Sequence, residues 1–144
     1  MKHLHTALIA TMALIGTTAL AIDVSKLPPA STRKDLTYEK DIKPILEASC
    51  AKCHGEKKPK GGLRVDNLEA LLKGGEEGKV VEAGNAVKSS LLIAVSQLDP
   101  DLSMPPKPKK RPAGAPEAPG GPPPKPLTPE QVGLVRAWID QGAK

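Results

Sequence analysis

Large aromatic side chains are almost absent from this 144-residue sequence, which has no Phe, one Tyr (Tyr38) and one Trp (Trp138). Aromatic rings usually contribute much of the area that a domain of this size buries. The hydrophobic fraction of 39% is nevertheless ordinary, and the length suits one globular domain. The core must therefore be built from small aliphatic side chains, which leaves room for another large apolar group at its centre.

The sequence also lacks the patterns of several functional classes. The formal net charge of +5 is small, and no basic patch is interleaved with aromatic residues as in a nucleic-acid-binding surface. There is no Ser-His-Asp arrangement, no paired carboxylate motif and no phosphate-binding loop. We therefore expect a protein that is not an enzyme and does not bind nucleic acid. Its modest positive charge would suit an acidic protein partner.

The N-terminal residues predict an export signal. Lys2 precedes an apolar run from Ala7 to Ile22, and Ala19-Leu20-Ala21 forms a small-x-small cleavage site near its end. We therefore expect a signal peptide at residues 1–21 and a soluble mature protein in the periplasm or another exported compartment, without a stable membrane span. The alternative is a retained membrane anchor, which is disfavoured because the run is shorter than the roughly 20 residues that cross a bilayer.

The rest of the chain predicts helices and no strands. Residues 22–37 are polar and contain Pro28-Pro29, which indicates an extended leader, with the packed domain at 38–144. Apolar residues then recur at helical spacing in four places, each with a start or stop signal. The expected helices run from about Asp41 to the cysteines, from Asn67 to Gly74, from Ser89 or Ser90 to before Asp99, and from Thr128 to Gly142. The predicted fold class is all-α, with about four helices and long loops.

The last of these helices has the strongest start signal. Thr128 is a candidate N-cap, Pro129 suits the first helical position, Gln131 completes a capping box, and Leu127 is placed as a hydrophobic staple. Residues 105–126, just before it, are rich in Pro, Lys and Gly and have too few apolar residues for a packed element. We therefore expect an insert loop at 105–126, partly in polyproline II conformation.

Both cysteines of the chain lie in the stretch ASCAKCHGEKK, as Cys50 and Cys53 directly before His54. A thioredoxin-like redox pair would need a βαβ context with the cysteines at a helix N-terminus. A zinc site would need about four ligands, usually in two separated pairs. A local disulfide would stabilise the fold little because its loop is short, and it would leave His54 without a role.

Covalent haem accounts for all three residues, because C-x-x-C-H is the attachment pattern of c-type haem. Two thiols three positions apart can reach the two vinyl groups of one porphyrin, and the imidazole that follows can bind the iron. Export fits this chemistry, and a porphyrin would supply the large apolar surface that aromatic side chains do not. We therefore predict one covalent haem, linked through Cys50 and Cys53, with His54 as an axial ligand. The other three chemistries remain alternatives.

The second axial ligand follows from a count of residues. The other two histidines and two methionines lie in the predicted signal peptide, so the mature chain keeps only His54 and Met104. Met104 lies in the prolyl segment DPDLSMPPKP, which can present a side chain without helical geometry. Because thioether sulfur is a known axial ligand of haem iron, we predict that Met104 is the sixth ligand. The alternative is a gap-filling core residue or a neighbour of an open site.

Five blocks of the sequence, taken in order, resemble the planctomycete-type cytochrome c domain, which has the class I cytochrome c-like fold. They are YEKDIKPILEASCAKCHG, GGLRVDNLEALLKGG, SSLLIAVS, DPDLSMPP and LTPEQVGLVRAWIDQGAK. The resemblance covers nearly all of residues 38–144. It implies a small all-α fold around one covalent haem, with thioether links at Cys50 and Cys53 and axial ligation by His54 and Met104. The long insert after Met104 departs from the family, whose chains usually pass quickly to the last helix.

These features favour an exported monohaem cytochrome that carries single electrons between redox partners. Two alternatives remain. One is a haem-based module that binds or senses a small ligand by displacing Met104. The other is an electron-transfer subunit of a larger oxidoreductase.

Further residues have weaker assignments. Arg64 could contact a haem propionate, because a buried carboxylate needs a charged donor, or it could be a solvated surface residue. Trp138 is expected to pack the last helix against the first, and its indole N–H is a second candidate donor to a propionate. The basic side chains near the insert could dock an acidic redox partner or simply be solvated. They are Lys107, Lys109, Lys110, Arg111 and Lys125, with Glu117 as the one acidic residue among them.

Overall fold

The structure is a computed structural model that describes residues 22–57, 59–107 and 124–144. Its helices are α1 (Lys43–His54), α2 (Leu68–Lys73), α3 (Ser90–Val95) and α4 (Pro129–Asp140). A π-helical turn at Tyr38–Ile42 leads directly into α1, and short 3-10 turns lie at Val24–Lys26, Lys60–Gly62 and Ala86–Lys88. The described ranges contain no strand, which confirms the all-α prediction. The predicted signal peptide and most of the insert lie outside these ranges.

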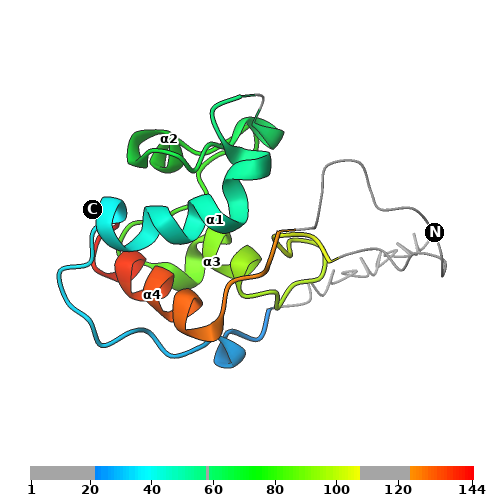
Figure 1. The fold of residues 1–144 in the computed structure, drawn as a ribbon. Helices are drawn as coiled ribbons and strands as arrows, with labels where there is room; N and C mark the ends of the chain where they lie inside the picture. Colours follow the sequence, from blue (N-terminus) through cyan, green and yellow to red (C-terminus); the bar gives the residue numbers. More distant parts are fainter. Residues whose placement is uncertain (1–21, 58, 108–123) are drawn as a thin grey trace, which may run out of the picture.

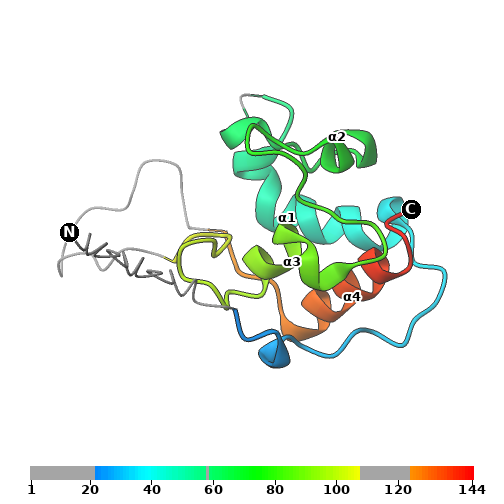
Figure 2. The same cartoon turned by 180° about the vertical axis from the view of Figure 1, so that it is seen from behind.

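α1 and α4 lie next to each other near the middle of the fold, and the other helices are arranged around them (Figure 1). The turn at Tyr38–Ile42 contacts α4, and α3 packs on α4. α2 lies on the opposite side of α1 from α4, together with the loops that flank it, as the reverse view also shows (Figure 2). No helix among the described residues is long and apolar enough to cross a membrane.

The helix α4 begins where the sequence predicts. The side chain of Thr128 accepts a hydrogen bond from the N–H of Gln131 (3.3 Å), and the N–H of Thr128 donates to Oε1 of Gln131 (2.9 Å). Pro129 occupies the first helical position, and Leu127 and Val132 are both buried. The capping box and the staple therefore form together and fix the direction in which the chain enters α4.

The cap residues predicted for the short helices α2 and α3 occupy their expected positions. Oδ1 of Asn67 accepts from the N–H of Ala70 (2.8 Å) to cap α2, and Gly74 ends it at φ 87°. Ser89 takes the N-cap position of α3 but makes no side-chain cap bond. Its buried hydroxyl accepts from the N–H of Glu82 (2.8 Å) and donates to the carbonyl of Asn85 (3.1 Å). That hydroxyl ties the preceding loop to the helix instead of capping it.

The core lies between the first and last helical segments. Trp138 and Tyr38 are its largest fully buried side chains, and their ring centroids are 6.0 Å apart in a tilted arrangement. The indole N–H of Trp138 donates to the carbonyl of Lys144 (2.9 Å), and so does the N–H of Tyr38 (2.7 Å). The predicted core role of Trp138 is confirmed, and its indole donor is engaged by the main chain rather than directed at a propionate.

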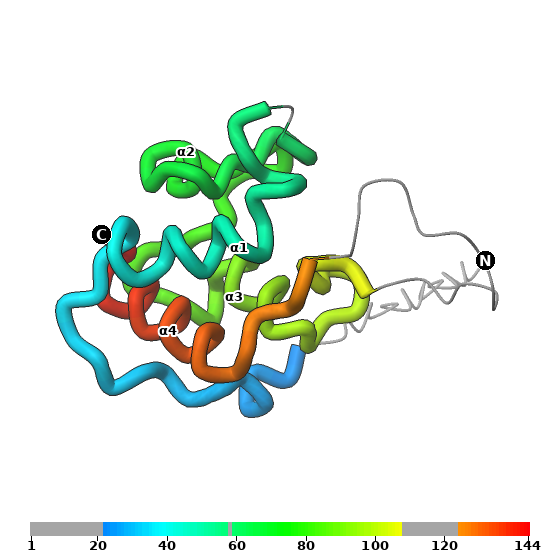
Figure 3. Tube along the Cα trace, in the orientation of Figure 1, coloured from blue at the N-terminus to red at the C-terminus, as the bar shows by residue number. Residues whose placement is uncertain are grey.

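The leader follows α4 closely instead of standing away from the domain (Figure 3). Its two leucines, Leu27 and Leu36, are buried in the core. The approach is close because residue 133 is Gly: a Cβ there would lie 2.6 Å from the carbonyl oxygen of Pro29. The core therefore reaches further toward the N-terminus than the predicted start of packing near Tyr38.

Main-chain groups of the leader bond directly to α4. The N–H of Ser31 donates to the carbonyl of Gly133 (2.9 Å), and Nη1 of Arg136 donates to the carbonyl of Pro28 (2.8 Å). An extended segment has no internal partners for its polar main-chain groups, so bonds of this kind are needed wherever it is packed against the protein.

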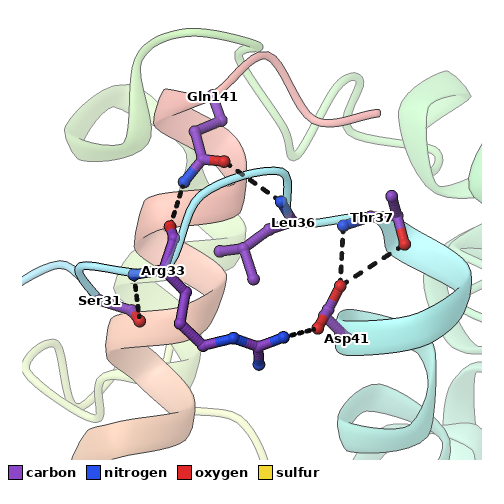
Figure 4. Close-up of polar contacts among 6 residues, drawn as sticks. All are labelled: Ser31, Arg33, Leu36, Thr37, Asp41 and Gln141. Carbon is purple, nitrogen blue, oxygen red and sulfur yellow. Dashed lines mark hydrogen bonds and ion pairs between the residues drawn. The ribbon is translucent and has the colours of Figure 1, made fainter.

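The end of the leader is held by a polar cluster (Figure 4). Gln141, just after α4, accepts from the N–H of Leu36 (3.2 Å) and donates to the carbonyl of Arg33 (2.9 Å). Asp41 accepts from the N–H of Thr37 (2.9 Å) and pairs with the Arg33 guanidinium. The bond from Thr37 and then the pairing with Arg33 hold the pKa of the Asp41 carboxyl below its ordinary value.

Candidate haem site

The end of α1 carries both cysteines and the histidine. Cys50 and Cys53 lie one helical turn apart, both are half-buried, and both are free thiols. Burial, followed by the neighbouring Cys53, raises the pKa of the Cys50 thiol to about 11. A redox-active pair needs the opposite, a lowered pKa at a helix N-terminus. The raised pKa of the Cys50 thiol therefore does not support a thioredoxin-like pair.

The His54 ring is oriented by the loop that follows α1. Its Nδ1 lies 3.3 Å from the carbonyl oxygen of Leu63. Because a carbonyl oxygen can only accept, Nδ1 must carry the proton, which leaves the lone pair of a neutral ring on Nε2. The N–H of Val65 donates to the carbonyl of His54 (2.8 Å), which holds the loop against the helix end. This arrangement is the one that prepares an imidazole to bind a metal through Nε2.

Met104 lies on a strap that is bonded to the end of α3. The N–H of Met104 donates to the carbonyl of Ala94 (2.9 Å), and Nε2 of Gln97 donates to the carbonyl of Pro105 (3.1 Å). Ser103 is buried, and its hydroxyl donates to the carbonyl of Asp99 (2.6 Å). The Met104 side chain itself is exposed, at 38% of its full area.

A hollow of about 400 Å³ brings the two predicted axial ligands together. His54 and Met104 both line it, although they lie far apart in the sequence, and Cys53 lines it beside them. Cys50 packs against the hydrophobic core. The other residues that line the hollow are Lys60, Gly61, Leu63, Gly75, Glu76, Glu77, Gly78, Val80 and Pro106.

The donor set of this hollow fits a covalently attached haem. The imidazole nitrogen and the thioether sulfur of the predicted His/Met pair line the same hollow, and both predicted attachment thiols lie on the last turns of the helix that carries the histidine. Leu63 and Val80 supply apolar surface. In the described part of the chain, no group of three or more His, Cys, Asp or Glu side chains could hold a metal ion.

Arg64 faces a different hollow from the one that contains His54. Its guanidinium forms two bonds to the Asp66 carboxylate, from Nε (2.9 Å) and from Nη2 (2.6 Å). That hollow, of about 350 Å³, is lined by α2 and the residues before it, including Asn67 and Lys73. The Arg64 bond holds the pKa of the Asp66 carboxyl at about 2. A propionate contact from Arg64 stays a prediction, and it would have to compete with Asp66.

Of the basic residues near the insert, Lys107 and Lys125 lie in the described part, and both are exposed. Lys109, Lys110, Arg111 and Glu117 lie outside the described residues. Sequence reasoning missed three groups that hold the segments around the site. The Leu63 carbonyl contacts the His54 ring, the Gln97 amide bonds to Pro105 next to Met104, and the Tyr38 hydroxyl donates to the carbonyl of Val65 in the loop after α1. A main-chain carbonyl cannot be found from sequence because every residue has one. A single Gln or Tyr belongs to no motif with a recognisable spacing.

The fold and the site define a small all-α domain with a c-type haem-attachment motif. Residues 50–108 match a family model described as Planctomycete cytochrome C, which confirms the resemblance seen in the sequence. This match supports a planctomycete-type cytochrome c domain in that part of the chain, and such a domain suggests a haem-binding, electron-transfer role. No curated protein and no solved structure matches the chain significantly.

Proposed function

We propose that this protein is an exported, soluble, monohaem c-type cytochrome that carries single electrons between redox partners, with a signal peptide at 1–21. The observation that carries the proposal is the shared hollow of His54 and Met104 at the end of the helix that bears Cys50 and Cys53. A haem bound there supplies a reversible one-electron couple.

The residues of the chain would each have a separate task. Cys50 and Cys53 attach the group, and the two thiols lie on one helix, so their spacing is set by helical geometry. His54 would bind iron through Nε2, because the Leu63 carbonyl engages Nδ1. Met104 supplies the sixth ligand from its strap. If His54 and Met104 both bind the iron, a small ligand would have to displace one of these two side chains to reach it.

The proposal is tested by haem staining of a denaturing gel, together with the absorption spectrum of the reduced protein. The chain is co-expressed with the c-type haem maturation machinery, and Cys50→Ala/Cys53→Ala is the matched control. We expect stain at the mobility of the wild-type chain and none for the control. An unstained wild-type chain, produced beside a stained reference cytochrome, would overturn the proposal.

A haem-based module for small-ligand binding is the second candidate, and the exposure of Met104 favours it, because an exposed ligand is more easily displaced. The two functions differ in the reaction of the ferrous protein with carbon monoxide. A six-coordinate low-spin form that resists carbon monoxide supports electron transfer, whereas rapid binding supports ligand sensing.

The redox partner is proposed to be an acidic protein. Lys107 is exposed and lies close in the chain to Pro106, which lines the hollow, and Lys125 is exposed at the other end of the insert. Opposite charges raise the rate of association more than the final affinity, and salt screens them. The rate of reduction by such a partner should fall as ionic strength rises, and Lys107→Glu should lower the rate at low salt. A rate that is independent of salt would contradict the acidic partner.

A further inference from the structure

Gln97 ends α3 in an unusual backbone conformation. Its φ is 58°, in the left-handed region that residues other than Gly rarely occupy. The conformation turns the chain away from the helix, and the half-buried side chain reaches the strap, where Nε2 donates to the carbonyl of Pro105 (3.1 Å).

The strap needs a donor from outside itself. Pro105 and Pro106 have no N–H, so this part of the main chain can form hydrogen bonds only through its carbonyl oxygens. The amide of Gln97 supplies the matching N–H. On the other side of the ligand position, the N–H of Met104 is already bonded to Ala94. The bond from Gln97 therefore holds the strap just after Met104, whereas the main chain of α3 holds it at Met104 itself.

Burial covers Met104 only in part, because 38% of the residue is exposed. Its position at the hollow therefore depends on how firmly the strap is attached to α3. Two bonds make this attachment, one to Met104 itself and one to Pro105, and only the second comes from a side chain.

We propose that Gln97 is a positioning residue that holds the Met104 strap over the hollow and so limits the displacement of Met104 by small ligands. The inference rests on the proposed axial role of His54 and Met104. Gln97 thereby biases the chain toward the electron carrier and away from the ligand-binding module.

The test uses the haem-loaded full chain and carbon monoxide as the probe. Gln97→Glu keeps the size of the side chain, but its ionised carboxylate has no N–H to donate. If carbon monoxide binds the fraction of molecules with the strap released, loss of one hydrogen bond should raise the binding rate of the ferrous protein about 2- to 10-fold. An unchanged rate in Gln97→Glu would overturn the inference.

Gln97→Gly separates the strap from general stability. Gly accepts the positive φ without strain, so this variant should unfold in urea at nearly the wild-type midpoint while it still binds carbon monoxide faster. Asp35→Gly is the matched control, because Asp35 also has a positive φ (56°) and lies in the leader, away from the strap. The control should bind carbon monoxide at the wild-type rate. An equal acceleration in Asp35→Gly would show that flexibility alone is the cause and would overturn the assignment to Gln97.

A double variant tests whether Gln97 acts through Met104. In a Met104→Ala background the ligand is gone, so Gln97→Glu should no longer alter the rate. An effect that persists there would place the action of Gln97 elsewhere and contradict the inference.

The wild-type spectrum separates this inference from the function on which it rests. Absence of the near-infrared sulfur-to-iron band in the oxidised wild-type protein overturns the ligation itself. Its presence, with no effect of Gln97→Glu, overturns only the role of Gln97.

Discussion

The hydroxyl of Tyr38 donates to the main-chain carbonyl of Val65, and this bond joins the turn before α1 to the loop that orients His54. The N–H of Val65 in turn donates to the carbonyl of His54, and the carbonyl of Leu63 accepts from the His54 ring. The loop at 63–65 is therefore held from both ends of the first helical segment. Burial, and then the charge of Glu39, raises the pKa of Tyr38 well above its ordinary value, so the hydroxyl stays a donor at any physiological pH.

Tyr38→Phe should destabilise the protein while it keeps the ring that packs on Trp138. The substitution leaves the buried carbonyl of Val65 without its donor, which costs about 1–3 kcal/mol. Urea unfolding of the haem-loaded protein measures the change, and Tyr38→Leu, which removes the ring as well, should cost more. A Phe variant as stable as the wild type would show that water replaces the lost donor.

Substitution of Met104 should change the spectrum in a way that identifies the sixth ligand. Met104→Ala should abolish the near-infrared sulfur-to-iron band of the oxidised protein. Met104→His should also abolish it but restore two nitrogen ligands, and it should lower the reduction potential, because axial Met raises the potential relative to a second His. Absorption spectra and a redox titration check both expectations. A band that survives in Met104→Ala would remove Met104 from the site.

The pair of Arg64 and Asp66 predicts a loss of stability in acid. The Arg64 bond lowers the pKa of Asp66 from 3.8 to about 2 in the folded state. Between about pH 4 and pH 2 the unfolded chain therefore binds a proton that the folded chain does not, and stability falls as the pH falls through this range. Asp66→Asn should remove this part of the pH dependence. Urea midpoints measured at several pH values test it, and equal slopes for the two proteins would contradict the prediction.

Gly133→Ala should destabilise the fold even though Ala is the better helix former. Helix propensity alone would favour Ala by about 1 kcal/mol. The new Cβ, however, would lie 2.6 Å from the Pro29 carbonyl and would push the leader from α4. We expect a net loss of up to about 2 kcal/mol in unfolding free energy, since overpacking typically costs about 1–3 kcal/mol. Trypsin should also cleave faster after Lys26 and Arg33. A variant more stable than the wild type would mean that the leader yields without cost.

Local signals predicted most of the helices correctly, because the information lies within a few residues. Thr128 and Gln131 form the capping box of α4, and Asn67 and Gly74 bound α2, as expected from side-chain chemistry alone. The cap of α3 differs because the Ser89 hydroxyl finds partners in the preceding loop, which local sequence does not reveal.

The packing of the leader could not be predicted from its own sequence. Leu27 and Leu36 are isolated apolar residues in a polar, prolyl segment, and they are buried only because α4 offers a surface to cover. For the site, the sequence indicated His54 and Met104 by their chemistry, and the structure brings both to one hollow. The groups that hold them, the Leu63 carbonyl and the Gln97 amide, depend on how distant segments meet.

The contact between the leader and α4 also bears on the order in which the molecule can fold. The leader precedes the rest of the described chain, and α4 is nearly its last part, so ribosomal synthesis delivers Leu27 and Leu36 long before the helix that covers them. The turn at Tyr38–Ile42 also cannot complete its packing before α4 is present, because the Tyr38 ring packs against Trp138 of that helix. The segment from Cys50 to His54 therefore remains part of an incompletely packed chain until α4 has been synthesised and has packed. Enzymes that modify the two thiols would therefore have better access to them before α4 packs than afterwards.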